Sequence, residues 1–95
     1  MPAPLSIVIP TLNAAPDLPP TLARLVEGLS AGMLREVIVS DGGSTDATET
    51  LAEEWGARLV VGDPGRGGQL RRGVTQARGD WVLVLHADTH LPDGW

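Results

Sequence analysis

The sequence predicts an α/β fold of three layers, with helices on both sides of a mostly parallel sheet. Short apolar segments alternate with segments of helical spacing, and the apolar segments are hydrophobic at consecutive positions, as in strands covered on both faces. Of the 95 residues, 42% are hydrophobic and 20% are charged, which provides enough apolar material for one packed core. We therefore expect residues 1–95 to form one domain, or part of one.

Four strands are predicted, one around each apolar run. They cover residues 5–10, 36–41, 58–62 and 81–86. Right-handed crossovers place consecutive strands of such a chain parallel, so their carboxyl ends should lie along one edge, where open α/β sheets bind ligands. Polar residues and glycines follow the strands at that edge, and we expect any functional site there.

Two of the three predicted helices are defined by their apolar stripes. The first begins near Asp17, and the third covers residues 68–78. The stripe of the first consists of Leu18, Leu22, Leu25, Val26 and Leu29, and that of the third of Leu70, Val74 and Ala77.

The remaining helix has the clearest boundaries. Asp46 and Glu49 have the spacing of a capping box, and Gly56 stands where a left-handed cap belongs. We therefore expect this helix to begin at Asp46 and to end before Gly56.

The composition excludes several function classes. The chain has no Cys and no Lys, which removes thiol chemistry, the P-loop lysine and Schiff-base catalysis. Its formal net charge of -5, and aromatic residues limited to three Trp, disfavour binding to nucleic acid and anionic membranes. No apolar run approaches a membrane span, and we expect a soluble cytoplasmic chain without a membrane segment.

Polar residues follow the first two strands. Pro10, Thr11 and Asn13 come after the first, without the glycines of a dinucleotide-binding loop. Asp41 ends the second strand and precedes Gly42 and Gly43. A carboxylate there can accept hydrogen bonds from a ribose or a base, and the glycines leave room for a flat ring, although Asp41 as a simple turn former is the alternative.

The fourth strand ends in His86 and Asp88, two residues apart. In an extended segment both side chains face the same way, so one oxygen ligand and one imidazole could hold a divalent cation. A His partner suits Mn better than Mg. The alternative is a hydrogen-bonded histidine at a strand end.

Three segments together resemble family 2 glycosyltransferases of the GT-A fold. They are residues 6–13 (SIVIPTLN), 36–46 (EVIVSDGGSTD) and 79–89 (GDWVLVLHADT), followed by Leu91 and Pro92. The resemblance covers essentially the whole chain and implies the N-terminal half of a GT-A domain, which binds a nucleotide-diphospho-sugar with a divalent metal, Mn or Mg, bridging the diphosphate.

The resemblance also implies which residues form the site. Asp88 matches the last carboxylate of the D-x-D motif, the usual metal ligand, with His86 beside it. An anionic donor on an acidic chain also needs local cations, and here the residues themselves indicate Arg66 as the first choice, with either Arg71 or Arg72 as a weaker candidate. The residues expected to bind the nucleotide are Pro10, Thr11, Asn13, Asp41, Gly42, Gly43, Arg66, Gln69 and Ala87.

Two positions depart from the family pattern. Gly42 stands where the family often has a second Asp, and His86 replaces the first carboxylate of D-x-D. A catalytically inactive nucleotide-binding module is therefore the alternative to an active transferase. A nucleotidyltransferase is disfavoured, because the first strand is followed by no Gly-rich signature and the chain has no Lys.

The implied reaction is transfer of a sugar to an unknown acceptor, and the family favours inversion. Family members are generally more than twice this length, and their acceptor half with the general base follows the D-x-D motif. We therefore expect the domain to be incomplete at residue 95, the chain alone to be inactive, and the catalytic base to lie outside it. An open sheet edge makes a homodimer conceivable.

Overall fold

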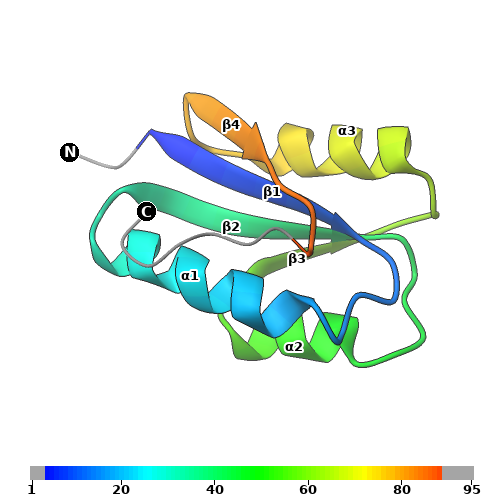
Figure 1. The fold of residues 1–95 in the computed structure, drawn as a ribbon. Helices are drawn as coiled ribbons and strands as arrows, with labels where there is room; N and C mark the ends of the chain where they lie inside the picture. Colours follow the sequence, from blue (N-terminus) through cyan, green and yellow to red (C-terminus); the bar gives the residue numbers. More distant parts are fainter. Residues whose placement is uncertain (1–3, 89–95) are drawn as a thin grey trace.

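Four parallel strands form the middle layer of the molecule, and helices cover both of its faces (Figure 1). The computed structural model describes residues 4–88. The elements are β1 (Leu5–Thr11), α1 (Leu18–Ser30), β2 (Leu34–Asp41), α2 (Thr48–Glu54), β3 (Arg58–Val61), α3 (Arg66–Gln76) and β4 (Trp81–Val84). Helices α1 and α2 lie on one side of the sheet and α3 lies on the other, which confirms the predicted three-layer α/β/α fold.

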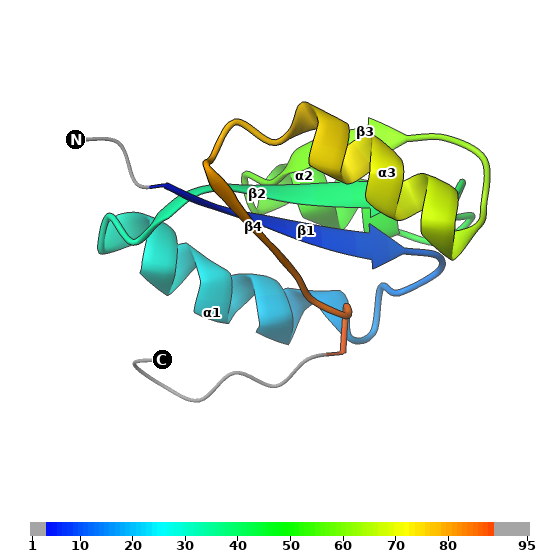
Figure 2. The same cartoon turned by 90° about the horizontal axis from the view of Figure 1, so that it is seen from above.

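The strand order is β3-β2-β1-β4, so β1 lies inside the sheet although it comes first in the chain. Strand β1 pairs with β2 on one side and with β4 on the other, and Figure 2 shows these strands from above. The register pairs Thr11 with Asp41 at the carboxyl ends of β1 and β2. This pairing brings together the polar segments that follow the first and second strands, around Thr11 and Asp41.

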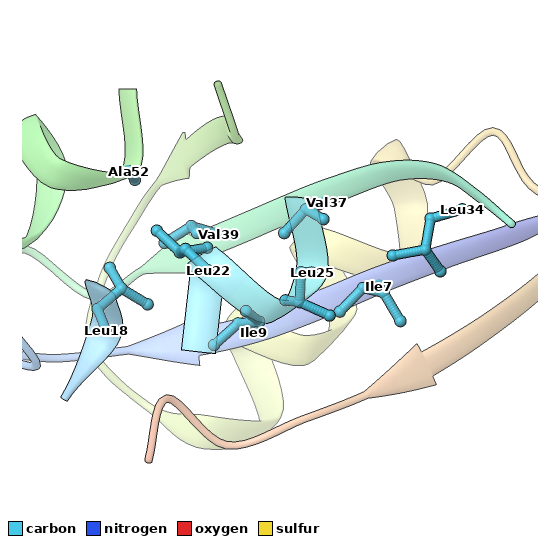
Figure 3. Packing of buried hydrophobic residues seen from close by; sticks show 9 residues of the cluster. All are labelled: Ile7, Ile9, Leu18, Leu22, Leu25, Leu34, Val37, Val39 and Ala52. Atoms are coloured by element: carbon cyan, nitrogen blue, oxygen red, sulfur yellow. The ribbon is translucent and has the colours of Figure 1, made fainter. Parts of the chain in front are cut away.

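The hydrophobic core lies between the sheet and α1. It consists of Ile7, Ile9, Leu18, Leu22, Leu25, Leu34, Val37, Val39 and Ala52 (Figure 3). Alternate residues of β1 and β2 face the other way, and of these Val8 and Ile38 are fully buried as well. Both faces of the two inner strands are therefore covered, as their consecutive apolar residues predicted.

The first and second helices follow their predictions with small changes. Three residues of the α1 stripe, Leu18, Leu22 and Leu25, are buried. Helix α2 starts at Thr48, two residues later than expected, and Gly56 adopts the expected left-handed conformation with φ of 79°. No helix within residues 4–88 is both long and apolar enough to cross a lipid bilayer.

The third helix differs from its prediction in position and in buried face. It begins at Arg66 and ends at Gln76, and its buried residues are Gln69 and Gly73, whereas Val74 is 46% exposed. A Cβ atom at position 73 would overlap the side chain of Val8. The helix therefore packs closely on the sheet through a glycine, which a search for large apolar residues overlooks.

Strand β4 is exposed along its whole length. The exposed fractions of its residues are Trp81 71%, Val82 37%, Leu83 42% and Val84 39%. The helices lie against β1, β2 and β3. The expectation that all four strands are covered on both faces is therefore wrong for β4 within the part of the chain that the structure describes.

Candidate functional site

The tips of β1 and β2 are joined through the side chain of Asp41. This carboxylate is fully buried, and its Oδ1 accepts hydrogen bonds from the hydroxyls of Thr11 and Ser44, both at 2.6 Å. Its Oδ2 accepts from the backbone N–H groups of Gly43 (3.0 Å) and Ser44 (2.7 Å). Four hydrogen bonds thus hold the loop after β2 in one conformation.

These contacts determine the ionisation of Asp41. Burial by itself would raise the pKa of Asp41, but the hydrogen bonds from Ser44 and Thr11 outweigh it and lower the pKa below its ordinary value. The side chain of Glu49 approaches the same carboxylate. Its hydrogen bond to Asp41, with smaller contributions from desolvation and from the negative charge of Asp41, raises the pKa of Glu49.

The predicted capping box is therefore wrong. Glu49 turns toward Asp41, and no side-chain hydrogen bond caps α2 at Ala47, the residue that precedes the helix. Asp46 does serve the helix start, because its Oδ1 accepts from the N–H of Thr48 at 2.9 Å and from the Thr48 hydroxyl. Its Oδ2 also accepts from the N–H of Ala15 at 3.1 Å, which ties the start of α2 to the loop after β1.

Asn13 fastens the loop after β1 to the loop after β2. It adopts a left-handed conformation with φ of 52°, which Asn tolerates better than most residues. Its Oδ1 accepts from the N–H of Thr45 at 2.8 Å, and its own N–H donates to the Ser44 hydroxyl at 2.8 Å. Asn13 and Asp41 therefore build one rigid pair of loops.

The glycine turn between β3 and α3 places Arg66 next to His86, the residue that follows β4. Gly65 has φ of 141°, and α3 begins at the next residue, Arg66. The Arg66 Nη2 lies 3.0 Å from Nε2 and 3.5 Å from Nδ1 of His86, which follows β4. Because a guanidinium is only a donor, the histidine nitrogen accepts in this contact.

An open pocket of about 180 Å³ lies at this edge of the sheet. It is lined by Pro10, Thr11, Leu12, Arg66, Gln69 and His86. Five of these six residues belong to the set predicted from the sequence. Leu12 was missed, because an apolar side chain that is 51% exposed after a strand carries no chemical signature.

Gln69 forms the inner wall of the pocket and is only 5% exposed. Its Nε2 donates to the backbone carbonyls of Thr11 (2.8 Å) and Ser40 (2.9 Å), and its Oε1 accepts from the N–H of Gly65 (3.1 Å). Both amide protons are therefore used within the protein. A Cβ atom on Gly42 would lie only 2.8 Å from this Oε1, so the glycine makes room for the amide.

The two candidate metal ligands have different surroundings. Asp88 is exposed at the end of the described chain, and His86 contacts Arg66. Within residues 4–88 no three His, Asp or Glu residues gather closely enough to hold a metal ion. A carboxylate with one imidazole nearby fits a hard cation only if further oxygen ligands come from a bound molecule, as the oxygens of a diphosphate can supply.

The remaining predicted residues have clear positions. The backbone carbonyl of Ala87 accepts from the Thr21 hydroxyl at 2.7 Å, which fastens the segment after β4 to α1. Arg72 turns away from the pocket and donates to the carbonyl of Asp63 at 2.7 Å, and Arg71 is exposed. Arg66 is thus the basic residue that lines the pocket. Thr89, Leu91 and Pro92 of the third motif lie outside the described residues.

Comparison with known proteins identifies the family. The model of the family described as "Glycosyl transferase family 2" matches residues 6–95. This chain belongs to glycosyl transferase family 2. The resemblance seen in the sequence motifs is thereby confirmed over nearly the whole chain.

Two mycobacterial relatives illustrate the similarity. A PGL/p-HBAD biosynthesis glycosyltransferase of Mycobacterium bovis is 39% identical over 99 residues, which cover 96% of this chain and 38% of that protein. A glucosyl-3-phosphoglycerate synthase of Mycolicibacterium paratuberculosis is 34% identical, over 93% of this chain and 29% of its own length. This family 2 chain therefore spans about two fifths or less of these relatives.

Solved structures share the fold. The glucosyl-3-phosphoglycerate synthase of Mycobacterium tuberculosis, in complex with Mn2+, UDP and glucosyl-3-phosphoglycerate, superimposes with a TM-score of 0.81 and 31% identity, over 90% of this chain and 35% of that one. The same enzyme has been solved with Mn2+, UDP-glucose and phosphoglyceric acid. The GT-A fold predicted from the sequence is confirmed, and this family 2 chain spans 35% of the solved chain.

Proposed function

We propose that this chain forms the donor-binding part of a glycosyltransferase that transfers a sugar from a UDP-sugar to an acceptor hydroxyl. The observation that carries the proposal is the pocket lined by Arg66, His86 and Thr11 at the carboxyl edge of the sheet. Open α/β sheets bind ligands at this edge, and relatives of the same fold bind UDP and Mn2+.

The base and ribose are placed against the tips of β1 and β2. Pro10 and Thr11 line the pocket there, and Asn13, Asp41 and Gly43 hold the surrounding loops in shape. Gly42 and Gly43 leave this surface without bulky side chains, as contact with a flat ring requires. Ala87, which follows β4 and accepts from Thr21 through its carbonyl, is assigned to the nucleotide on the sequence motif alone.

The diphosphate is placed beside Arg66. The chain has a net charge of -5, so an anionic ligand needs a local cation, and the Arg66 guanidinium lines the pocket. We assign Asp88 and its neighbour His86 to the divalent cation. A cation bound there would stabilise the negative charge that develops on the departing nucleoside diphosphate.

The acceptor, the general base and the inverting course of the reaction belong to the proposal for the whole protein. A carboxylate that deprotonates the acceptor hydroxyl would complete the mechanism. The replacement of carboxylates at positions 42 and 86 supports a second candidate, a module that binds nucleotide without transferring sugar. The two candidates differ in their dependence on metal.

Calorimetric titration with UDP, GDP and CDP, each with Mn2+ and with EDTA, tests the proposal. We expect UDP to bind more tightly than the other two and to require the metal. Binding that EDTA leaves unchanged would favour the inactive module. Absence of binding by the full-length protein would refute both.

Replacing Asp88 by Ala tests the metal assignment. We expect the variant to lose at least tenfold in UDP affinity when Mn2+ is present, because the cation-mediated contact is removed. In EDTA the variant and the wild type should behave alike. Asp63→Ala is the matched control, since Asp63 is an exposed carboxylate that follows β3 and does not line the pocket. Equal affinity of Asp88→Ala and wild type with Mn2+ would exclude Asp88 as a ligand.

A further inference from the structure

The amide of Gln69 joins three separate segments at the back of the pocket. It donates to Thr11 at the end of β1 and to Ser40 near the end of β2, and it accepts from Gly65 in the turn before α3. All three partners are backbone atoms. A buried amide with both protons and its oxygen engaged is costly to disturb, because removing it leaves the Gly65 N–H without this acceptor and takes a donor from each carbonyl. The Thr11 carbonyl would keep the Gly42 N–H as a donor, at 2.9 Å.

The three segments depend on Gln69 to different degrees. The tips of β1 and β2 are also held by their ladder and by the bond from Thr11 to Asp41. The glycine turn is anchored less. Residues 63–65 are exposed, and besides Gln69 the turn is held by the Arg72 guanidinium, which donates to the Asp63 carbonyl at 2.7 Å. Loss of Gln69 should therefore free the turn while the strand tips stay in place.

The turn carries Arg66, the cation of the pocket. Arg66 is the first residue of α3 and Gln69 lies one turn later on the same helix. We propose that Gln69 is a positioning residue of the donor site, which fixes the glycine turn so that Arg66 faces the diphosphate. This inference rests on the proposed function, and it replaces the direct contact with the nucleotide that the sequence motif suggested for Gln69.

Gly42 lies beside the Gln69 amide and is part of the same arrangement. A side chain at position 42 would meet both the Gln69 amide, at 2.8 Å from Oε1, and the backbone of Pro64, at 3.0 Å from its Cα. A carboxylate at position 42 would therefore require the Gln69 amide or the Pro64 backbone to shift. The glycine at the position of the family's second Asp therefore fits the place that the Gln69 amide occupies.

The experiment compares UDP with uridine as ligands of the full-length protein in the presence of Mn2+. We expect Gln69→Ala to weaken UDP binding at least tenfold and uridine binding less than threefold, because the displaced Arg66 serves only the phosphates. Gln69→Met keeps the length of the side chain without its hydrogen bonds and should give the same pattern. It replaces Gln69→Ala in the test if the alanine variant does not fold. Gln76→Ala, a change on the exposed end of the same helix, is the matched control and should alter neither affinity.

Hydrogen exchange of the Gly65 amide provides a second readout that needs no nucleotide. This N–H should exchange faster in Gln69→Ala and in Gly42→Ala than in wild type, because both changes displace its acceptor.

The outcomes separate the two proposals. A wild-type protein that binds UDP, together with a Gln69→Ala variant of unchanged UDP affinity, overturns the positioning role alone. Equal losses for UDP and uridine also overturn it, since they indicate general damage to the fold. A wild type that binds neither ligand overturns the proposed function, and with it the role of Gln69 in donor binding.

Discussion

Asp41 shows how a single side chain can serve a site by organising it. The carboxylate is fully buried and accepts four hydrogen bonds from Thr11, Gly43 and Ser44. A motif search treats such an aspartate as a ligand-binding residue. The geometry shows that its oxygens are engaged by the loop, so the carboxylate determines the shape of the loop surface, and contact with a nucleotide stays a prediction.

The stability of the protein should depend on the charge of Asp41. Folding lowers the pKa of Asp41 below its unfolded value of about 3.9. The ionised carboxylate therefore contributes fully to the free energy of unfolding above that pH, and the contribution is lost as the pH falls through the lower folded pKa. We expect Asp41→Asn to cost about 1–3 kcal/mol at pH 7 and less at pH 2.5. Urea unfolding at both pH values measures the loss of stability, and Asp17→Asn, at an exposed position, is the control. An equal loss of stability at pH 7 and pH 2.5 would contradict the role of the Asp41 charge.

Glu49→Gln should stabilise the protein at neutral pH. The pKa of Glu49 is raised by Asp41, so protonated Glu49 is favoured in the folded state, and this advantage is lost as the pH rises through the folded value. A neutral amide keeps a donor toward Asp41 at every pH. The melting temperature should therefore increase at pH 7 and change little at pH 3.5. An unchanged or lower melting temperature at pH 7 would contradict a repulsion between the two carboxylates.

At the level of elements, α3 differs from the other helices in the way it meets the sheet. Helix α1 packs through leucines, whereas α3 packs through Gly73 against Val8 and through the amide of Gln69. The closer approach brings the start of α3 to the tips of β1 and β2. The position of Arg66 in the pocket is a consequence of this packing.

Two glycines of α3 should respond in opposite ways to replacement by Ala. Gly73→Ala should cost about 1–3 kcal/mol, because its Cβ overlaps Val8 in a closely packed interface. Gly67→Ala should be neutral or stabilising by up to about 1 kcal/mol, because nothing lies within 4 Å of its Cβ and Ala favours a helix. Urea unfolding of both variants checks this, and similar costs for the two would refute the close approach.

The sequence predicted the elements that carry regular patterns and missed contacts that depend on the tertiary structure. Runs such as Ile7–Ile9 specified buried strands, and the motifs specified five of the six residues that line the pocket. The direction of Glu49 and the buried face of α3 were predicted wrongly, because local spacing contains no information about Asp41 or Val8. The roles of the individual site residues toward a nucleotide stay predictions.

For the whole molecule, the sheet is covered unevenly. Its inner strands are buried on both faces, whereas all four residues of β4 are exposed within residues 4–88. Burial of apolar side chains, which stabilises the described part of the fold, is therefore concentrated in the layers around β1 and β2. The chain also spans only 38% of a relative with which it is 39% identical.

Truncation of two leucines measures this uneven coverage. Leu25 is fully buried and Leu83 is 42% exposed, so in the chain of residues 1–95 Leu25→Ala should cost about 2–5 kcal/mol and Leu83→Ala less than half as much. The free energy of unfolding in urea gives both values. Equal costs would mean that β4 is covered in solution, for instance by a second copy of the chain.

The strand order also affects how the chain folds. The first strand needs β2 on one side and β4 on the other, and the bond from Gly79 to Ser6 spans 73 positions of sequence. Closing such long loops costs entropy before the contacts form, so folding rates fall as contacts become less local. During synthesis β1 can pair with β2 early, but it can pair with β4 only after the ribosome has released β4.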